Sequence, residues 1–518
     1  MTGRWKAASA RVLCPILAGT TLSISLAVAS TPRVCIDESS RGARSLRAPA
    51  AVLNYLNDPS STTYDQRMAC ARWAGTFSER NRSIAARLPK SNPLPARYIL
   101  FPARPLGVRH LADRLSMTGS VASIELADTF LIASFPKRTP MRRLRTLLLD
   151  TPQIEFAEPD CDGPDFQTTS QDFMSPTGDR PSCWTRSARD TFPNDPCIDE
   201  LWGHRKIGWN SQIAAHSVPR LVAVLDSGID ARHEDLVSGV LVSFKTLEPR
   251  RSQGGRLNAR CATSGRCYPH GTEMAGTIAG RMDNGIGVAG VAPNSQLLPI
   301  VISQVEHGTL GRLSTIARGI DAAVRGHADI INISAKWPVD SRAIGDAVLA
   351  AVGGAEAGHR IIVTGYATSL DTDESVREYF PSQYRCLPGV LAAVPADMRN
   401  HELSNPERRP DANDGRIQAP GVDIVVTTTE NSERGYALSG AAGASSAAAY
   451  VSGAVALVWG SPPLNQCDAQ QIKRLLFCRS KSSDSTRYPW IHVGFLRELA
   501  NFDSSADCGA VMEALGCN

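Results

Sequence analysis

The sequence lacks three features that would point to whole classes of protein. No Cys-x-x-Cys pair occurs among its 13 cysteines, so we expect no structural zinc site. Beyond the N-terminal segment there is no run of about 18 apolar residues, so we expect no membrane span in the mature protein. The net charge is only +4, divided between a basic N-terminal part and an acidic remainder. That pattern fits contact between the two parts, and chance drift of charge between domains explains it equally well. It does not indicate nucleic acid.

What is present begins with a segment typical of a cleavable secretory signal, residues 1–29. Arg4, Lys6 and Arg11 give it a positive start, residues 12–28 are apolar or small, and residues 27–29 (AVA) fit a cleavage site. A membrane anchor is the alternative, but the segment is short and diluted by Ser, Thr and Gly. We therefore expect a secreted or periplasmic protein.

Twelve cysteines remain when Cys14 leaves with the signal (13 − 1). An even number of cysteines behind a signal indicates disulfides formed in an oxidising compartment. The short spacings 261/267, 467/478 and 508/517 suggest local pairs, although sequence does not decide the connectivity.

At 518 residues the chain is too long for one compact core. Residues 97–160 combine short strands with helical stretches and predict a small α/β unit. From residue 200 onward, short apolar strands alternate with helices, and their continuous apolar runs predict a parallel sheet buried on both faces. The candidate strands are 221–225, 297–302, 329–333, 361–364, 390–394 and 424–427. The predicted fold class is α/β, a three-layer sandwich around a mainly parallel sheet.

Residues 443–460 form an almost uninterrupted run of small and apolar residues that begins Gly-Ala-Ser. A helix that is apolar on every side has to be buried. Ser445, at its start, would be held rigidly beside backbone N–H groups that have no partner within the helix. Such groups favour negative charge and can bind an oxyanion. A close-packed helix without any chemistry explains the same run of residues.

Two other residues stand at element boundaries of the same predicted domain. Asp226 directly follows the strand 221–225, at the end of the sheet where ligands bind in such folds. His270 opens a second small-residue helix, where packing alone does not require a histidine. The chain order Asp226, His270, Ser445 is one of the orders in which catalytic triads occur. An α/β-hydrolase esterase would carry its serine first, in a Gly-x-Ser-x-Gly motif whose second Gly is Ala447 here.

Taken together, these motifs resemble those of the subtilisin-like serine proteases, the subtilases. The matching segments are 222–230 (VAVLDSGID), 270–272 (HGT), 284–293 (NGIGVAGVAP), 328–334 (ADIINIS) and the serine motif at 438–445. The resemblance covers residues 97–500. It implies that Ser445 is the nucleophile of a serine endopeptidase, that His270 is its general base and that Asp226 orients the imidazole.

The resemblance also implies which groups bind the substrate. Ser334, Ala335 and Lys336 are expected to line the cleft, and the backbone N–H of Ser445 to supply half of the oxyanion hole. Subtilases usually have an asparagine as the second donor, but this chain places Thr368 or a neighbouring residue there. A hydroxyl from Thr364 or Thr368, or a water, is a hypothetical substitute. Loss of that donor costs on the order of 10²–10³ in turnover, a figure that comes from a subtilisin. A catalytically impaired, peptide-binding subtilase-fold protein is therefore the alternative.

Finally, the resemblance implies a preproprotein that acts on proteins or peptides. Residues 97–160 look like the family's inhibitor-type propeptide, a small ferredoxin-like α/β domain that blocks the cleft until it is cleaved. No cofactor is expected, and calcium, which is common in the family, has no recognisable ligand set. The expected divisions are a signal peptide 1–29, an N-terminal pro-region 30–96, the propeptide 97–160, a linker with the maturation site 161–191, the catalytic domain 192–502 and a Cys-containing tail 503–518.

Overall fold

The structure is a computed structural model. It describes residues 97–103, 106–136, 151, 153–160, 183, 186–236, 269–302, 311–336, 341–353, 359–366, 381–385, 387–399, 415–428, 435–439, 443–480 and 488–517. The expected signal peptide and pro-region, residues 1–96, lie outside these ranges. So do Thr368 and most of the linker 161–191.

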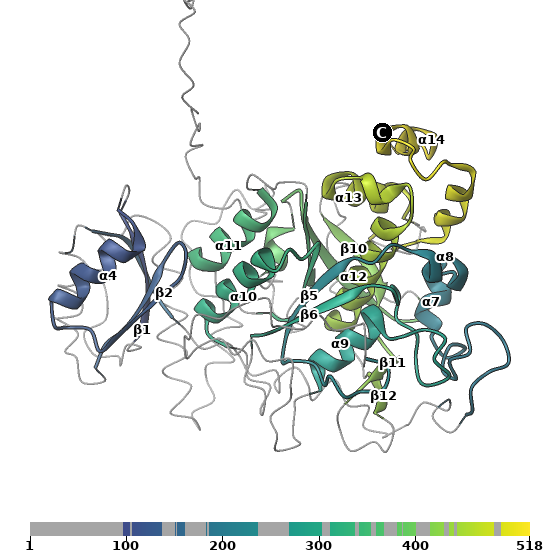
Figure 1. The fold of residues 1–518 in the computed structure, drawn as a ribbon, viewed down its shortest axis with the longest axis horizontal. Coiled ribbons are helices and arrows are strands. Elements are labelled where there is room, and N and C mark those ends of the chain that lie inside the picture. The colour runs from purple at the N-terminus through teal and green to yellow at the C-terminus, as the bar shows by residue number, and fades with distance from the viewer. Residues whose placement is uncertain are drawn as a thin grey trace, which may run out of the picture. The chain divides into compact units, whose positions relative to one another are not determined.

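A six-stranded parallel sheet forms the centre of the larger folded part (Figure 1), and its strands run in the order β10-β9-β8-β7-β5-β6. Every neighbouring pair in it is parallel. Its strands are β5 (Leu221–Asp226), β6 (Gln296–Val301), β7 (Ile330–Ile333), β8 (Ile361–Gly365), β9 (Val390–Ala396) and β10 (Arg416–Pro420). The predicted parallel sheet is therefore confirmed.

Helices cover both faces of this sheet because side chains alternate along each strand. In β5, Val222 and Val224 belong to the apolar cluster with helices α9 and α12, whereas Ala223 and Leu225 belong to the cluster with α10 and α11. The bounds of these helices are α9 (His270–Ala279), α10 (Leu313–Arg325), α11 (Arg342–Gly353) and α12 (Ala444–Gly460). The result is the three-layer α/β sandwich that the sequence predicted (Figure 1).

One predicted strand lies outside the parallel sheet. Residues 424–427 form β11 (Ile424–Thr427), which pairs antiparallel with β12 (Tyr436–Ser439) in a two-stranded hairpin. The sixth place in the sheet belongs to β10, whose apolar run is interrupted by the buried Gln418 and by Pro420. Proline is tolerated there because β10 is an edge strand of the sheet.

Residues 97–160 contain a separate four-stranded antiparallel sheet with the order β2-β3-β1-β4. This is the ferredoxin-like order, and α4 (Val108–Met117) covers one face through Leu111 and Leu115. Residues 141–150, where Leu144, Leu147 and Leu148 at helical spacing predict a second helix, lie outside the described residues. The strands are β1 (Arg97–Pro102), β2 (Ser123–Leu126), β3 (Leu131–Ser134) and β4 (Ile154–Pro159).

Two disulfides, Cys467–Cys508 and Cys478–Cys517, fasten the C-terminal segment. They join the ends of α13 (Ala469–Cys478) to the ends of α14 (Cys508–Ala514). The local pairs 467/478 and 508/517 suggested by spacing are therefore wrong. A helix lies between the members of each, and at about 1.5 Å per residue it holds them beyond the roughly 7 Å between Cα atoms that a disulfide can span.

A third disulfide joins Cys183 to Cys197, so disulfide formation itself is confirmed. The suggested pair 261/267 lies outside the described ranges. In the tail 503–518, Val511 and Met512 are buried in the main apolar core, so this segment packs as part of the larger fold.

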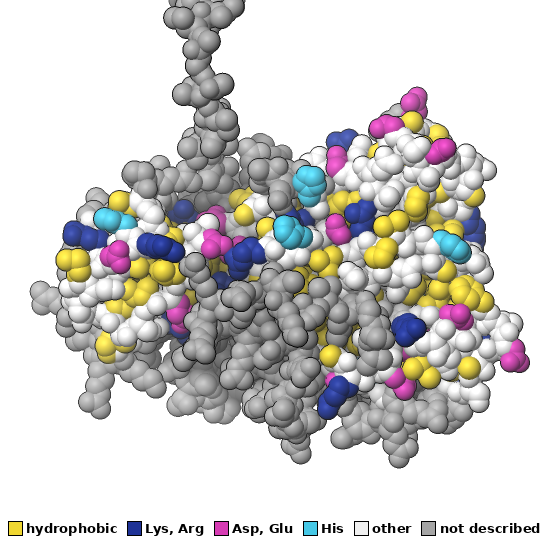
Figure 2. All heavy atoms as spheres, viewed as in Figure 1, with side chains coloured by type: hydrophobic (Ala, Val, Ile, Leu, Met, Phe, Trp, Pro, Cys, Tyr) yellow, Lys and Arg dark blue, Asp and Glu magenta, His cyan; other side chains and the backbone are white. Residues whose placement is uncertain are grey.

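The surface of the described part is mixed in character. Figure 2 shows acidic and basic side chains interspersed with apolar ones on the visible face. The large apolar side chains that are exposed are widely spaced in the sequence: Met117, Leu126, Phe192, Val218 and Met398. Within the ranges that the structure describes, no helix is both long enough and apolar enough to span a membrane.

Candidate active site

Asp226 ends β5 and is completely buried. Its Oδ1 accepts a hydrogen bond from the backbone N–H of Ser227 at 2.7 Å. The Nδ1 atom of His270 lies 2.8 Å from Oδ1 and 2.9 Å from Oδ2, so both carboxylate oxygens face the imidazole. A carboxylate in this position holds the proton on Nδ1 and leaves Nε2 as the basic nitrogen.

His270 is brought onto Asp226 by a close approach of helix to loop. It is the first residue of α9, and a Cβ atom at the next residue, Gly271, would lie only 2.2 Å from the carbonyl oxygen of Gly228. The N–H of Gly271 also donates to Ser227 Oγ at 3.0 Å. Glycine is therefore required at position 271, because any side chain would push the start of α9 away from Asp226.

The charge environment makes His270 a stronger base than a free imidazole. Burial by itself lowers its pKa, but the charge and hydrogen bond of Asp226 raise it by more, and Glu273 adds a smaller contribution in the same direction. The net result is a pKa above the ordinary value of 6.5. The imidazolium form is thus favoured once a proton arrives on Nε2.

Ser445 is the second residue of α12, whose following residues are buried along the whole helix. It exchanges two hydrogen bonds with Ser334, which follows β7. Ser445 Oγ donates to the carbonyl oxygen of Ser334 at 3.2 Å, and Ser334 Oγ donates to the carbonyl oxygen of Ser445 at 3.3 Å. Because the helix begins at Ala444, the N–H of Ser445 has no acceptor within the helix and is suited to an oxyanion.

Asp226, His270 and Ser445 share one edge of the sheet. Ser334 comes after the end of β7, which lies between β5 and β8. The last residue of β8, Gly365, is so close to α12 that its Cβ would lie 2.9 Å from the carbonyl oxygen of Ala444. Helices α9 and α12 are in contact on one face of the sheet. The carboxyl ends of β5, β7 and β8 thus lie together at the site. Asp226 ends β5, and the residues at the ends of β7 and β8 contact the start of α12.

Residues 220–487 match the family model described as the subtilase family. The chain belongs to the subtilase family. It is a subtilisin-like serine endopeptidase by that membership. The chain is 34% identical over 238 residues to the major intracellular serine protease of Bacillus subtilis (strain 168), which covers 46% of this chain and 67% of that protein. It is 31% identical over 243 residues to a subtilisin of Bacillus pumilus, covering 47% and 77% of the two chains.

Among solved structures, the subtilase is similar to fervidolysin from Fervidobacterium pennivorans, described as a keratinolytic enzyme related to subtilisin. The TM-score is 0.58 and the sequence identity 20%. The match covers 81% of this chain and 63% of fervidolysin, less than two thirds of its length. At this identity the likeness shows the fold alone.

Three residues expected to line the substrate cleft, 334–336, lie within the described part of the chain. Ser334 and Ala335 are buried, and Lys336 is partly exposed. Thr368, the expected second oxyanion donor, lies outside the described residues. Thr364 is completely buried within β8, and its hydroxyl donates to the carbonyl oxygen of Gly365 at 3.3 Å.

Calcium does not fit the buried carboxylates of this subtilase. Asp195 accepts from the backbone N–H groups of Asp283 and Asn284, at 2.8 and 3.4 Å. Asp235 accepts from Asn284 Nδ2 at 2.8 Å and from Tyr436 Oη at 2.9 Å. Calcium needs six to eight oxygen ligands, whereas N–H and O–H donors face these carboxylates. Among the residues that are described, no group of three or more His, Cys, Asp or Glu could hold a metal ion.

Burial sets the protonation of the same two groups. It raises the pKa of Asp195 to about 6 and that of Asp235 to about 7, against their hydrogen bonds, which lower both values. A carboxyl group with a raised pKa takes up protons in the folded state at a pH where the unfolded chain has already lost them. The stability of the fold therefore depends on pH in this region.

Three polar residues close to the site carry little signal in the sequence: Asn332, Ser452 and Ser227. Asn332 carried the one available signal, since it is a polar residue in the otherwise apolar strand 330–333. Ser227 and Ser452 lie in motifs where small residues are common. Their contacts are made with residues far away in the chain, so no local pattern marks them.

Proposed function

We propose that this subtilase is a secreted serine endopeptidase, made as a preproprotein, that cleaves peptide bonds through Asp226, His270 and Ser445. The observation that carries the proposal is the imidazole of His270 held on the buried carboxylate of Asp226, at the sheet edge where Ser445 begins α12. The same pairing argues against the catalytically impaired, peptide-binding alternative.

The proposed reaction follows from these positions. Ser445 Oγ attacks the scissile carbonyl carbon while His270 Nε2 takes its proton, and the N–H of Ser445 binds the oxyanion. His270 then protonates the leaving amine, which departs and leaves an acyl group on Ser445. Water, deprotonated by His270, hydrolyses this ester and releases the acid. The hydroxyl of Ser445 donates to Ser334 at rest, so it has to rotate towards His270 first.

Hydrolysis of an unfolded protein substrate tests this mechanism. Ser445→Ala is expected to abolish turnover, because removing the nucleophile of such a triad costs on the order of 10⁶ in kcat. Ser446→Ala is the matched control, since it removes a neighbouring buried hydroxyl and is expected to retain activity. Parental turnover in Ser445→Ala, or binding of peptides by the processed parent without hydrolysis, would contradict the proposal.

We also propose that residues 97–160 act as an intramolecular inhibitor. The open face of their sheet supports this, because its side chains join the apolar cluster of helices α10 and α11. Ile99 of β1 and Phe130, directly before β3, belong to one cluster with Ile316 of α10 and Ile344 of α11. The guanidinium carbon of Arg342, on α11, also lies 4.6 Å from the ring centre of Phe101.

Two carboxylates at the end of β4 cap the two helices. Glu158 accepts from the N–H groups of Arg342 and Ala343 at 3.0 and 3.1 Å, and from Ser341 Oγ at 2.9 Å, at the start of α11. Asp160 accepts from the N–H and the Oγ of Ser314 at 3.0 and 2.8 Å, at the start of α10. Helix N-termini favour negative charge and have unpaired N–H groups, so both contacts are stabilising.

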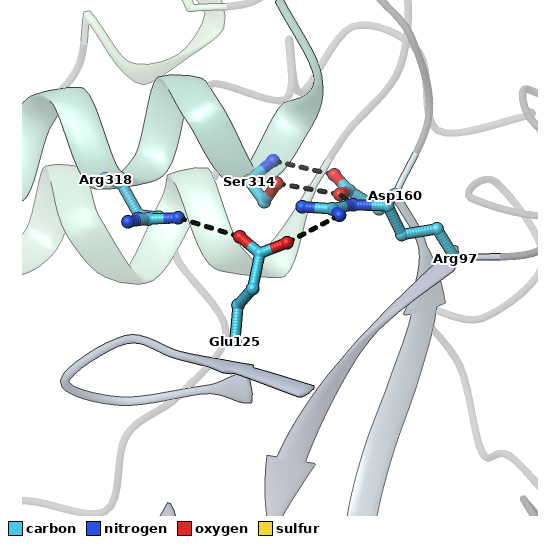
Figure 3. Close-up of polar contacts among 5 residues, drawn as sticks. All are labelled: Arg97, Glu125, Asp160, Ser314 and Arg318. Carbon is cyan, nitrogen blue, oxygen red and sulfur yellow. Dashed lines mark hydrogen bonds and ion pairs between the residues drawn. The ribbon is translucent and has the colours of Figure 1, made fainter. Parts of the chain in front are cut away.

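Charged side chains extend the contact of Asp160 along α10 (Figure 3). Arg97 donates to Asp160 and to Glu125, each at 2.7 Å, and Glu125 in turn contacts Arg318 of α10 at 3.3 Å. Asp160 is followed directly by the linker 161–191. The chain therefore leaves the small sheet at the start of α10, a helix of the catalytic sandwich.

Secretion and self-processing complete the proposal. The three disulfides support an oxidising compartment. N-terminal sequencing of the product is expected to give a new start within residues 161–191 for the parent. Ser445→Ala is expected to accumulate uncut at that place. Identical cleavage of the two proteins would contradict self-processing, and a product retained in the cytoplasm would contradict secretion.

A further inference from the structure

A series of hydrogen bonds between side chains connects α12 to the middle of the parallel sheet. Asn332 lies in β7 and is completely buried between β5 and β8. Its Oδ1 accepts from Ser452 Oγ at 2.9 Å, and its Nδ2 donates to Ser334 Oγ at 2.9 Å. The amide of Asn332 therefore contacts both Ser452, two turns after Ser445 on α12, and Ser334, which faces Ser445.

From Asn332 onward, each side chain donates to the next residue: Asn332 to Ser334, and Ser334 to Ser445. Because Ser334 Oγ accepts from Asn332, the single hydroxyl proton of Ser334 is left for the carbonyl oxygen of Ser445. Ser445 donates its own hydroxyl back to the carbonyl oxygen of Ser334. The amide of Asn332 thus decides which way the Ser334 hydroxyl points, and that hydroxyl holds the first turn of α12.

Packing does not explain an amide at this position. The other three residues of β7 are isoleucines, and an amide buried in such a strand is unfavourable unless its hydrogen bonds are made. Ser452 lies seven residues after Ser445 (452 − 445), two helical turns along the same face of α12. Asn332 is therefore held at one end of its amide by the α12 face that carries the nucleophile, and at the other end by Ser334, which contacts the nucleophile.

The register of the sheet relates this contact to the aspartate. Asn332 is level with Val224 of β5, and Ile333 with Leu225. The next residue on each strand is Ser334 on one side and Asp226 on the other. Fixing α12 to Asn332 and Ser334 therefore sets the height of Ser445 relative to the pair of Asp226 and His270.

We propose that Asn332 is a positioning residue for the nucleophile, acting through the hydroxyl of Ser334. It holds Ser445 where a rotation of its Oγ reaches His270, and it contacts neither the substrate nor the reacting atoms. The inference rests on the proposed role of Ser445 as nucleophile. It adds a residue whose loss lowers reactivity even when folding and substrate contacts are intact.

A double-mutant cycle on the processed protein tests the proposal. The rate constant for labelling by a small fluorophosphonate, per folded molecule, is measured for the parent, Asn332→Leu, Ser334→Ala and the double variant. Displacement of a nucleophile slows such a reaction, and each single substitution is expected to slow it about tenfold. The double variant is expected to react within about twofold of Ser334→Ala, because both act through one hydroxyl. The midpoint of the acid limb should stay at the parental pH, since Asp226 and His270 are unchanged.

Three results would overturn the proposal. Parental labelling of Asn332→Leu at a lower melting temperature would make the residue purely structural. Multiplied effects in the double variant, about 100-fold in total, would mean that Asn332 does not act through Ser334. A parent that is not labelled at all would refute the proposed function itself, and this inference with it.

A second variant covers the case in which Asn332→Leu does not fold. Ser452→Ala removes one tether of the amide and keeps its bond to Ser334. Labelling about two- to fivefold slower, with no further loss on combining it with Ser334→Ala, would support the proposal. A parental labelling rate in Ser452→Ala would count against it.

Discussion

Substituting Glu158 by alanine is expected to weaken the docking of residues 97–160 onto the larger folded part. Glu158 makes the contact between the two parts at the start of α11. The side chain is 2% exposed and accepts three hydrogen bonds from the first turn of α11 and the residue before it. In Glu158→Ala these donors face no acceptor as long as the two parts stay together. After dissociation, water satisfies them in both proteins. The substitution therefore weakens the bound state alone.

The size of this effect follows from the type of contact. Hydrogen bonds to a charged group contribute about 1.5–3 kcal/mol each, and deletion of a helix N-cap costs about 0.5–2 kcal/mol. The three bonds share one carboxylate and are not additive, so we expect a total of about 2–4 kcal/mol. That corresponds to a dissociation constant about 30-fold to 700-fold higher, at about 1.4 kcal/mol for each factor of ten.

The assay uses the full chain with Ser445→Ala, so that it does not digest itself. A recognition site for an added sequence-specific protease is placed in the linker 161–191, and dissociation of the N-terminal fragment is followed after the cut. Asp128→Ala is the matched control, because Asp128 forms an exposed ion pair with Arg325 across the same interface. Such exposed pairs contribute only about 0–1 kcal/mol.

Equal dissociation constants for Glu158→Ala and Asp128→Ala would refute this account of the interface. Glu158 would then be no more important than an exposed charge, and the cap on α11 would contribute nothing to docking. Stronger dissociation in Glu158→Ala should also appear as earlier release of protease activity in the chain that keeps Ser445.

Three further predictions concern protonation and the disulfides. Activity should rise with pH through a midpoint above 6.5, because only neutral His270 accepts the serine proton. Glu273→Gln should lower that midpoint, since the charge of Glu273 raises the pKa of His270, and an unchanged or raised midpoint in the pH–rate profile would contradict the assignment. The folded pKa of Asp235 is raised to about 7, so stability should fall as pH rises from about 4 to 7. Melting temperatures should show this loss in the Ser445→Ala chain and a smaller loss after adding Asp235→Asn, because Asp195 still contributes up to about pH 6; an equal loss in the two chains would contradict the assignment. Replacing Cys467 and Cys508 by Ala should lower the free energy of unfolding by about 4 kcal/mol, because the disulfide closes a loop of 41 residues in the unfolded chain. A denaturation midpoint equal to the parent's would contradict this prediction.

Much of the fold is predictable from local sequence because the central strands are buried on both faces. Strands such as β5 and β9 are nearly continuous apolar runs, and both were located within two residues of their observed ends. The sequence does not predict β10, because Gln418 and Pro420 interrupt its apolar run. The apolar run of β11 predicts a strand of the parallel sheet, which is wrong, since hydropathy does not reveal a strand's pairing partner.

The candidate site divides in the same way. Asp226, His270 and Ser445 stand in short motifs at element boundaries, which local sequence reveals. The hydrogen bonds of Asn332 join strand and helix across 120 residues, and the disulfides cross between two helices, so neither could be predicted from spacing. The role of Thr368 stays a prediction.

Mapping the adduct of a fluorophosphonate on the processed protein tests the central claim most directly. The probe reacts with a serine only when a base and an oxyanion site activate it. The account predicts one adduct per molecule, located by mass spectrometry on Ser445 and absent from Ser445→Ala. No adduct, or an adduct on another serine that persists in Ser445→Ala, would contradict it.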